Sequence, residues 1–384
     1  MAKKRANGEG NIRKRKDGRW EGRYTAGYDP ETGKRIIKNV LGKTQAEVKE
    51  KLSQAQQETA GLDVARSEDY TVATWLRSWY ELYAKPNVRP ATADRYRLII
   101  ETYTIPRIGK IKLKKLTSRD LQKLYKDLME RGRIQKRSGK GNPGLSSTTV
   151  RSVHLTLHCA FERAVKERLI PRNPTDDCIA PKVQKVEMKT LRPEHLKSYL
   201  DAADARGVLP MFYLELVSGL RKGELVALLW DDLDLETQTL SISKSAGRIN
   251  GEVKVTQPKT ANSVRTIYLP QETIDLLIQE HAKHPGNPIM FPSPVTGNLY
   301  GPDCIGRLHK NLLKKAGITE NIPFHGLRHT FATLAIQQGI DAKTVSSILG
   351  HYSAGFTLDT YTHVTNEMQR EAAQRMGSFM AQTV

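Results

Sequence analysis

The amino-acid sequence predicts a multidomain, mainly α-helical protein. We expect a small three-stranded β-sheet plus one helix at the N-terminus, a helical bundle in the middle, and a mixed, mostly helical third part with a small β-sheet. A length of 384 residues allows two or three domains with their own cores. Strand-like alternation is confined to the N-terminal end and to residues 239–269, whereas helical spacing dominates elsewhere.

The N-terminal residues predict a β-hairpin, a third strand and a helix. Asp17-Gly18 is a typical tight turn between two strand-like arms, and a second turn at 29–34 precedes the third strand at 35–40. From Thr44 the pattern becomes helical, and Glu47 lies three residues after this candidate N-cap. The predicted unit is about the size of β-ribbon modules that enter a DNA groove.

Basic and aromatic side chains are concentrated on the predicted hairpin. We therefore expect DNA contacts from Arg13, Lys14, Arg15, Arg19, Trp20, Arg23 and Tyr24. The alternative is a structural hairpin whose arginines are simply solvated.

Helical spacing dominates the middle of the chain and most of the remainder. The predicted helices of the middle part lie at 71–83, 91–103, 118–131 and 146–167, with a basic, glycine-rich loop at 136–142. After a charged linker at 181–189, Thr190 is a candidate cap for a helix that begins near Pro193. The exception is 239–269, which contains Asn250-Gly251 and predicts a small sheet.

The net charge of +20 is unevenly distributed. Division near Arg66 and Met188 gives 16 Lys/Arg against 9 Asp/Glu, then 25 against 13, then 20 against 19. The first two parts therefore carry nearly all of the positive charge, which indicates that they bind a polyanion while the third part has another task. A lysine-rich solvated surface is the alternative.

The cysteines and the hydropathy indicate a cytoplasmic protein without a membrane partner. Cys159, Cys178 and Cys304 are odd in number and widely spaced, which argues against a disulfide framework or a zinc site and is typical of a reducing cytosol. Apolar runs are shorter than the roughly 18 residues of a membrane span, and the N-terminus lacks the apolar core of a signal peptide.

Four short motifs bring together residues that suit attack on a phosphodiester. They are Ser218-Gly219-Leu220-Arg221, His325-Gly326-Leu327-Arg328-His329, Leu349-Gly350-His351 and Asp359-Thr360-Tyr361-Thr362-His363. Two guanidinium forks can hold the non-bridging oxygens of a phosphate bidentately. A tyrosine, whose free pKa is near 10, needs a proton acceptor and nearby positive charge to act as a nucleophile at neutral pH.

In this order and at these separations, the motifs resemble those of tyrosine recombinases of the lambda-integrase type. The sequence is most similar to integrases of integrative and conjugative transposons, and the resemblance covers essentially the whole chain. It implies an arm-type DNA-binding domain at 1–66, a core-binding helical domain at 67–184, and a catalytic domain with a C-terminal assembly helix at 185–384.

The resemblance also implies a role for each motif residue. Arg221 and Arg328 match the two arginines that stabilise the charged transition state, and Tyr361 matches the nucleophile. His325 matches the position that handles its proton, and His351 the position that hydrogen-bonds the phosphate. Lys259, in Gln257-Pro258-Lys259-Thr260, matches the general acid that protonates the leaving 5′-hydroxyl.

Several of these assignments have competitors in the sequence. Glu224, three residues after Arg221, is expected to orient that arginine, although a plain salt bridge is the alternative. Lys244 and Lys254 lie in the same predicted sheet as Lys259. Tyr300 and Tyr352 are the nearest tyrosines outside the motif, and either motif histidine could instead be structural.

The implied function is site-specific recombination, the integration and excision of a mobile element through a 3′-phosphotyrosyl intermediate. It implies a tetramer on double-stranded DNA at the prokaryotic nucleoid, with an excisionase and a host DNA-bending protein as possible partners. We expect no cofactor and no metal, because the sequence lacks a phosphate-binding Gly-x-x-x-x-Gly-Lys-Ser/Thr loop and carboxylates spaced for Mg²⁺. The alternatives are a type IB topoisomerase-like enzyme and a non-catalytic DNA-binding regulator.

The C-terminal residues predict one amphipathic helix. Its apolar stripe consists of Met368, Ala372, Met376, Phe379 and Met380. This stripe either docks onto a neighbouring protomer during assembly or packs on its own domain.

Overall fold

The computed structural model describes residues 11–28, 33–59, 70–134, 143–183, 188–249, 251–256 and 264–350, together with individual residues between 370 and 381. The chain divides into two compact units, Met1–Lys185 and Val186–Val384. Each unit has its own hydrophobic clusters. None of the helices in the described ranges is long and apolar enough to cross a lipid bilayer.

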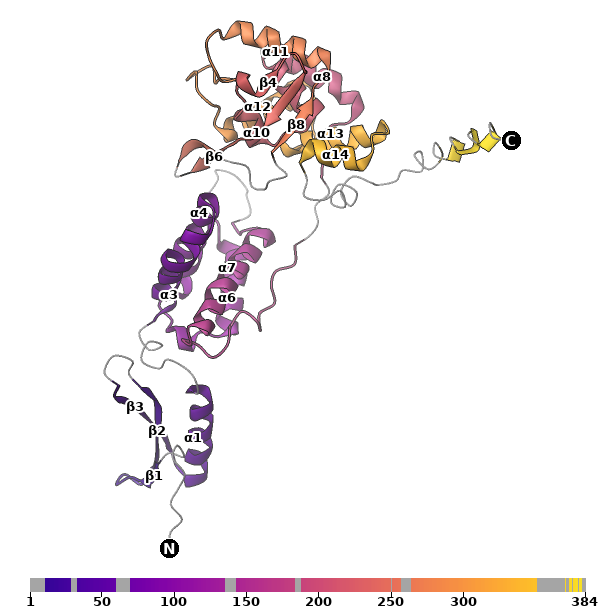
Figure 1. Cartoon of the computed structure of the whole chain (residues 1–384). Helices are drawn as coiled ribbons and strands as arrows, with labels where there is room; N and C mark the ends of the chain where they lie inside the picture. Colours follow the sequence, from indigo (N-terminus) through magenta and orange to yellow (C-terminus); the bar gives the residue numbers. More distant parts are fainter. Residues whose placement is uncertain are drawn as a thin grey trace. The chain divides into compact units, whose positions relative to one another are not determined.

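The N-terminal sheet is antiparallel with the order β1-β2-β3, and one helix covers one of its faces (Figure 1). The elements are β1 (Asn11–Lys14), β2 (Trp20–Tyr28), β3 (Arg35–Gly42) and α1 (Gln45–Thr59). The close approach of α1 depends on Gly22, because a Cβ there would lie 2.8 Å from Val48 Cγ1. Thr44 Oγ1 accepts the backbone N–H of Glu47, as a capping residue does.

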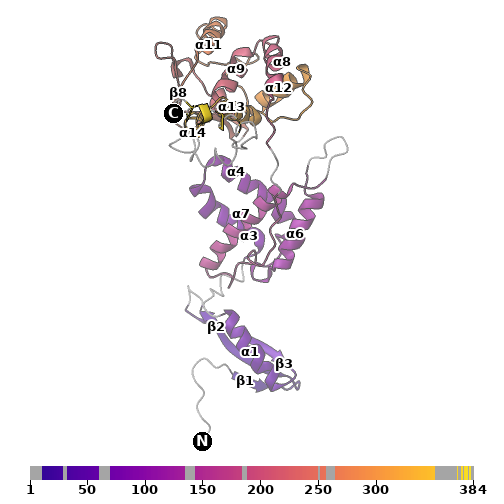
Figure 2. The ribbon, with the colours of Figure 1, turned by 90° about the vertical axis from the view of Figure 1, so that its right-hand side faces the viewer.

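The rest of the first unit is helical (Figure 2). Its elements are α3 (Val72–Trp79), α4 (Pro90–Leu98), α5 (Ile105–Ile108), α6 (Ser118–Arg131) and α7 (Ser147–Lys166), with π-helical turns at Tyr80–Ala84 and Ile99–Thr104 and 3₁₀ turns at Lys85–Asn87 and Leu113–Lys115. Trp75 fixes α3 on α7, because its buried indole donates to the Ala160 carbonyl at 2.9 Å. Helix α6 begins with a capping box between Thr117 and Asp120.

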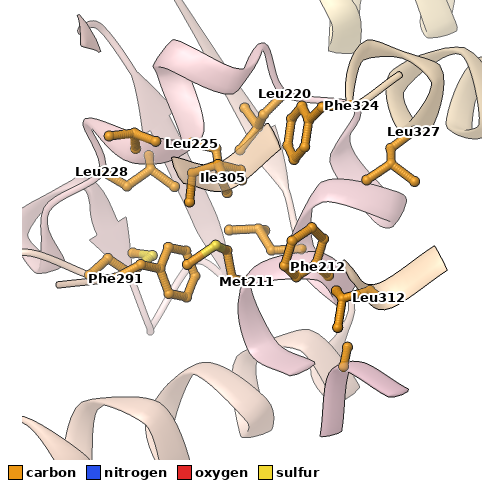
Figure 3. Close-up of a cluster of buried hydrophobic side chains, with 14 of the residues drawn as sticks. Met211, Phe212, Leu220, Leu225, Leu228, Phe291, Ile305, Leu312, Phe324 and Leu327 are labelled. Atoms are coloured by element: carbon orange, nitrogen blue, oxygen red, sulfur yellow. The ribbon is translucent and has the colours of Figure 1, made fainter. Parts of the chain in front are cut away.

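The second unit surrounds one central helix, α9, which packs against α8, α11 and α13. Figure 3 shows the core, in which Met211 of α9 lies beside Phe291, and Phe212 of α9 lies on the side of Leu312 and Phe324. The helices are α8 (Pro193–Asp204), α9 (Leu209–Ser218), α10 (Lys222–Val226), α11 (Gln271–Lys283), α12 (Pro302–Lys315), α13 (His325–Gln337) and α14 (Ala342–Leu349), with a 3₁₀ turn at Trp230–Asp232.

The strands of this unit form two sheets. A three-stranded sheet has the order β4-β5-β8, and a separate hairpin pairs β6 with β7. The strands are β4 (Leu233–Asp234), β5 (Thr239–Ile242), β6 (Ser245–Ile249), β7 (Glu252–Thr256) and β8 (Arg265–Tyr268). The hairpin packs against α10 and α12, and β8 contacts α14.

The predicted fold class is confirmed, with two local corrections. Residues 239–269 do not form one sheet, because β5 pairs with β8 while β6 and β7 pair with each other. Thr190 does not cap α8: Arg192 is the N-cap residue, and Pro193 opens the helix without a side-chain cap. The three-domain division stays a prediction, and the loop at 136–142 and most of the C-terminal stripe lie outside the described residues.

A carboxyl group is buried in α9. Glu215 is fully buried, and neither of its carboxylate oxygens has a hydrogen-bond partner among the described residues. Burial raises the pKa of Glu215 well above its usual value, against the opposing charges of Arg328 and Arg265. The group is therefore protonated in the folded protein at pH values where it ionises in the unfolded chain.

We predict that Glu215→Met stabilises the protein increasingly as pH rises. Above the unfolded pKa of about 4.5, the unfolded chain releases a proton that the folded protein retains, so stability falls with pH until the folded pKa is reached. An unpartnered buried polar group costs about 1–3 kcal/mol, and each kcal/mol shifts Tm by about 2–4 °C in a domain of this size. Thermal unfolding of the variant and the wild type at pH 5 and pH 8 measures the increase in Tm, which should be larger at pH 8.

Glu215→Gln is the matched control, because it removes the ionisation and keeps a buried polar group. It should lose the pH dependence of the wild type and gain less stability than the methionine variant. A methionine variant that is less stable than wild type at both pH values would contradict this account of Glu215.

Candidate active site

Arg221 follows the left-handed end of α9. Gly219 has a φ of +58°, and a Cβ at this position would lie 2.7 Å from both Leu349 Cδ2 and Phe331 Cδ1. Glycine is therefore required both by the backbone conformation and by the close approach of α13 and α14. The chain then turns, and Arg221 becomes the N-cap residue of α10.

Glu224 holds Arg221 in place. Its Oε2 accepts the backbone N–H of Arg221 at 2.9 Å, and its Oε1 accepts Nη1 of the same arginine at 2.7 Å. Burial opposes ionisation of Glu224, but the hydrogen bonds and charges of Arg265 and Arg221 outweigh it and lower its pKa. The side chain of Arg221 remains 37% exposed, so the fixed guanidinium is accessible to a ligand.

A third arginine, Arg265, completes this ion-pair network. Its Nη2 donates to Glu224 Oε2 at 2.9 Å, and its Nε donates to the Ile348 carbonyl at 2.5 Å. The carboxylate of Glu224 therefore bridges Arg221 and Arg265. We did not single out Arg265 from the sequence, although the alternation of β8 places it in phase with the buried Ile267.

Arg328 of α13 is buried, with 1% of its surface exposed. Its Nη1 donates to the Gly219 carbonyl and its Nη2 to the Leu349 carbonyl, each at 2.7 Å. Arg221 Nη2 donates to the next carbonyl, that of Gly350, at 3.0 Å. Arg328 thus ties the end of α9 to the end of α14.

The three arginines converge on the C-terminal end of α14. The successive carbonyls of Ile348, Leu349 and Gly350 accept hydrogen bonds from Arg265, Arg328 and Arg221 respectively. Carbonyls in the last turn of a helix have no intrahelical partner and carry partial negative charge. The helix end therefore attracts and orients three cations, which we call the arginine cluster.

His325 begins α13 beside the arginine cluster. Part of its ring reaches solvent, yet partial desolvation and then the charges of Arg328 and Arg221 lower its pKa. The ring of His329 lies 4.8 Å away at 85°, and burial lowers the pKa of His329 to about 4, with His325 and Arg328 contributing. His325 is therefore neutral at pH 7 and able to accept a proton.

A basic hollow of about 510 Å³ adjoins this histidine. Lys222 of α10, and Arg307 and Lys310 of α12, line it together with His325. Three cations in one recess beside the arginine cluster, with Asp303 also in the lining, make this hollow a candidate site for the backbone of a nucleic acid.

The structure thus brings Arg221, Glu224, Arg328 and His325 together. Lys259, His351 and Tyr361 lie outside the described residues, so their assignments stay predictions. In the sequence, His351 directly follows Gly350, and Lys259 lies between β7 and β8.

The residues that compete with Lys259 and Tyr361 in the sequence make contacts elsewhere in the second unit. Lys244 pairs with Asp232 at 3.0 Å, and Lys254 pairs with Glu252 at 3.2 Å. Tyr300 packs against the core of the second unit. Tyr352 lies outside the described residues.

The candidate DNA-contact residues of the N-terminal sheet separate onto different surfaces. Tyr24 is buried in the core beneath α1, because it lies in phase with Gly22 on the covered face, so the expectation that it contacts DNA is corrected. Trp20 and Lys14 pair with each other across β1 and β2. Four arginines remain at the surface: Arg15 and Arg19 lie at the turn, where both pair with Asp17, and Arg13 and Arg23 lie on the face opposite α1.

Comparison with known proteins agrees with this architecture. Residues 189–368 match the model of the phage integrase family, and residues 71–129 match the N-terminal SAM-like domain of phage integrases. The ICEBs1 integrase of Bacillus subtilis is 27% identical, over 96% of this chain and 100% of its own length. A XerC-like tyrosine recombinase of Caldanaerobacter subterraneus is 27% identical, over 92% of this chain and 94% of its own.

Solved structures share the fold. The Tn1549 transposon integrase in complex with a circular intermediate DNA superposes with a TM-score of 0.66 at 22% identity, covering 80% of this chain and 100% of that one. A lambda integrase tetramer bound to a Holliday junction gives a TM-score of 0.61 at 19% identity, covering 93% and 97%. The chain is a tyrosine-type site-specific recombinase that resembles the phage integrase family over residues 71–129 and 189–368.

Proposed function

We propose that this recombinase integrates and excises a mobile DNA element by cutting and rejoining strands through a 3′-phosphotyrosyl intermediate. The observation that carries the proposal is the arginine cluster, with a neutral His325 beside it, inside a region matched by the integrase family model. The similarity to recombinases over most of the chain favours this function over topoisomerase-like relaxation. A non-catalytic regulator would not need such a cluster.

Arg221 and Arg328 bind the scissile phosphate in this proposal. Each guanidinium is a planar fork of N–H donors, and contacts with protein carbonyls and, for Arg221, with Glu224 fix its position. In this proposal both guanidinium groups are held rigidly where negative charge develops on the phosphate oxygens. Each such preorganised donor typically contributes about 10²–10³ in rate.

Tyr361 is the proposed nucleophile. Its oxygen bonds to the phosphorus and the bond to the 5′-oxygen breaks, while neutral His325 takes the tyrosine proton. Lys259 gives a proton to the departing 5′-oxygen, and His351 hydrogen-bonds the phosphate. The hydroxyl of a partner strand later reverses these steps, so the phosphotyrosyl link conserves the energy of the broken bond and no nucleotide cofactor is needed.

The remaining regions supply DNA binding and assembly. We propose that residues 67–184 grip the DNA beside the cleavage site and that residues 1–66 bind a separate arm-type site. Exchange between two duplexes requires several protomers, and the related lambda integrase is a tetramer on a Holliday junction, which supports a tetramer here. An excisionase and a host DNA-bending protein are the proposed accessory partners, at the nucleoid in the prokaryotic cytoplasm.

We predict that Tyr361→Phe abolishes covalent attachment to DNA and leaves DNA binding intact. The substrate is a nicked duplex that carries the element ends, so that the cleaved strand diffuses away and the adduct accumulates. Denaturing gel electrophoresis detects the protein–DNA adduct. Tyr352→Phe is the matched control and should form adduct at the wild-type rate; an adduct formed by the Tyr361 variant would refute the assignment.

We predict a second, separate footprint that depends on residues 1–66. The full chain should protect both the cleavage region and a distant segment of the element end, whereas a chain that begins at Ser67 should protect the cleavage region alone. Nuclease protection with both proteins, at concentrations that saturate the cleavage site, measures this difference. Footprints of equal extent would rule out an arm-binding role.

A further inference from the structure

Glu21 occupies the centre of the N-terminal sheet on the face opposite α1. Its neighbour Gly22 faces α1, so the alternation of β2 directs Glu21 to the other side. Within the N-terminal module, which we define as β1, β2, β3 and α1, no described helix covers this face. The side chain of Glu21 is nevertheless only 2% exposed. The side chains that cover it come from all three strands.

Three donors surround the carboxylate. Arg13 Nε donates to Glu21 Oε2 at 2.7 Å, Asn39 Nδ2 donates to Oε1 at 2.9 Å, and Arg23 Nε reaches Oε1 at 3.4 Å. The hydrogen bonds from Asn39 and Arg13 lower the pKa of Glu21 to about 2, so it is ionised throughout the physiological range. We call these four residues the Glu21 network.

A carboxylate at this position is unexpected on a surface that binds DNA. Negative charge repels phosphates, so removal of the Glu21 carboxylate would strengthen the electrostatic attraction between this face and DNA. The position of Glu21 is explained if its task is to orient the arginines rather than to attract DNA.

The network leaves recognition groups available. The side chains of Arg13 and Arg23 are 55% and 49% exposed. Both contact Glu21 through Nε, which leaves the terminal Nη pair of each guanidinium for a ligand. Such a pair fits the O6 and N7 atoms of guanine, and an asparagine amide fits adenine in the major groove.

We propose that the Glu21 network is a base-reading site that holds Arg13, Arg23 and Asn39 toward purine edges in the major groove of DNA. Glu21 acts as a positioning residue that makes binding sequence-specific. Because it fixes the rotamers before binding, less conformational entropy is lost on recognition. The proposal rests on the proposed DNA-binding function of residues 1–66.

The test compares full-length Glu21→Gln with full-length Glu50→Gln. Glu50 is exposed on α1, so both variants lose one negative charge from the same module, and only one loses the network. The wild-type protein first selects duplexes from a randomised library, and the enriched sequence that requires residues 1–66 becomes the specific probe. Each protein then binds the specific probe in competition with a scrambled duplex of equal length. The specificity ratio is the affinity for the specific probe divided by the affinity for the scrambled duplex.

We expect Glu21→Gln to lower the specificity ratio at least tenfold, with affinity for scrambled DNA unchanged or higher. A tenfold change, about 1.4 kcal/mol, is the size expected for the loss of one good bidentate base contact. Glu50→Gln should keep the wild-type ratio. A full-length Arg13→Lys variant, which retains the charge and loses the fork, should also lower the ratio and serves as a second test if Glu21→Gln is poorly folded.

Equal specificity ratios for the Glu21 and Glu50 variants would overturn the proposal and leave the arm-binding function standing. If the wild-type protein enriches no sequence that depends on residues 1–66, the arm-binding function itself fails, and the proposal fails with it.

Discussion

The second unit depends on the C-terminal end of α14, where three successive carbonyls hold three arginines. Arg328, nearly completely buried, also binds the carbonyl of Gly219 and so fixes the end of α9 to the end of α14. This contact is possible because Gly219 has no side chain to separate the helices. One helix end therefore determines where the cations lie, and the same chain continues directly into His351.

Buried carboxylates have two different roles in this protein. Glu224 bridges Arg221 and the largely buried Arg265, and Glu21 joins Arg13, Arg23 and Asn39. In both places an ionised carboxylate fixes the position of guanidinium groups. A charged arginine needs no activation to bind phosphate or guanine, but it does need a defined position. Glu215 has no such partners in the described chain, so burial keeps it protonated.

Much of the fold follows from local patterns in the sequence. The Asp17-Gly18 turn and the periodic helices at 118–131 and 146–167 were predictable in this way, whereas the clustering of Arg221, Arg328 and His325 was expected from the resemblance to tyrosine recombinases. Long-range pairing was not: alternation within 239–269 does not reveal that β5 pairs with β8 across an intervening hairpin. Likewise, the role of Arg265 depends on α14, about eighty residues away in the chain, and the burial of Tyr24 depends on α1.

The most direct test of the arginine cluster is the rate at which the Arg265→Met variant cleaves DNA. The rate is measured at saturating DNA and at a temperature well below the melting temperature of the variant. Arg265 touches Glu224 and the end of α14, and its proposed contribution to catalysis is through the position of Arg221. The account predicts that the rate of covalent adduct formation falls at least tenfold, about 1.4 kcal/mol, while DNA affinity stays at the wild-type value. An unchanged rate of adduct formation would contradict it.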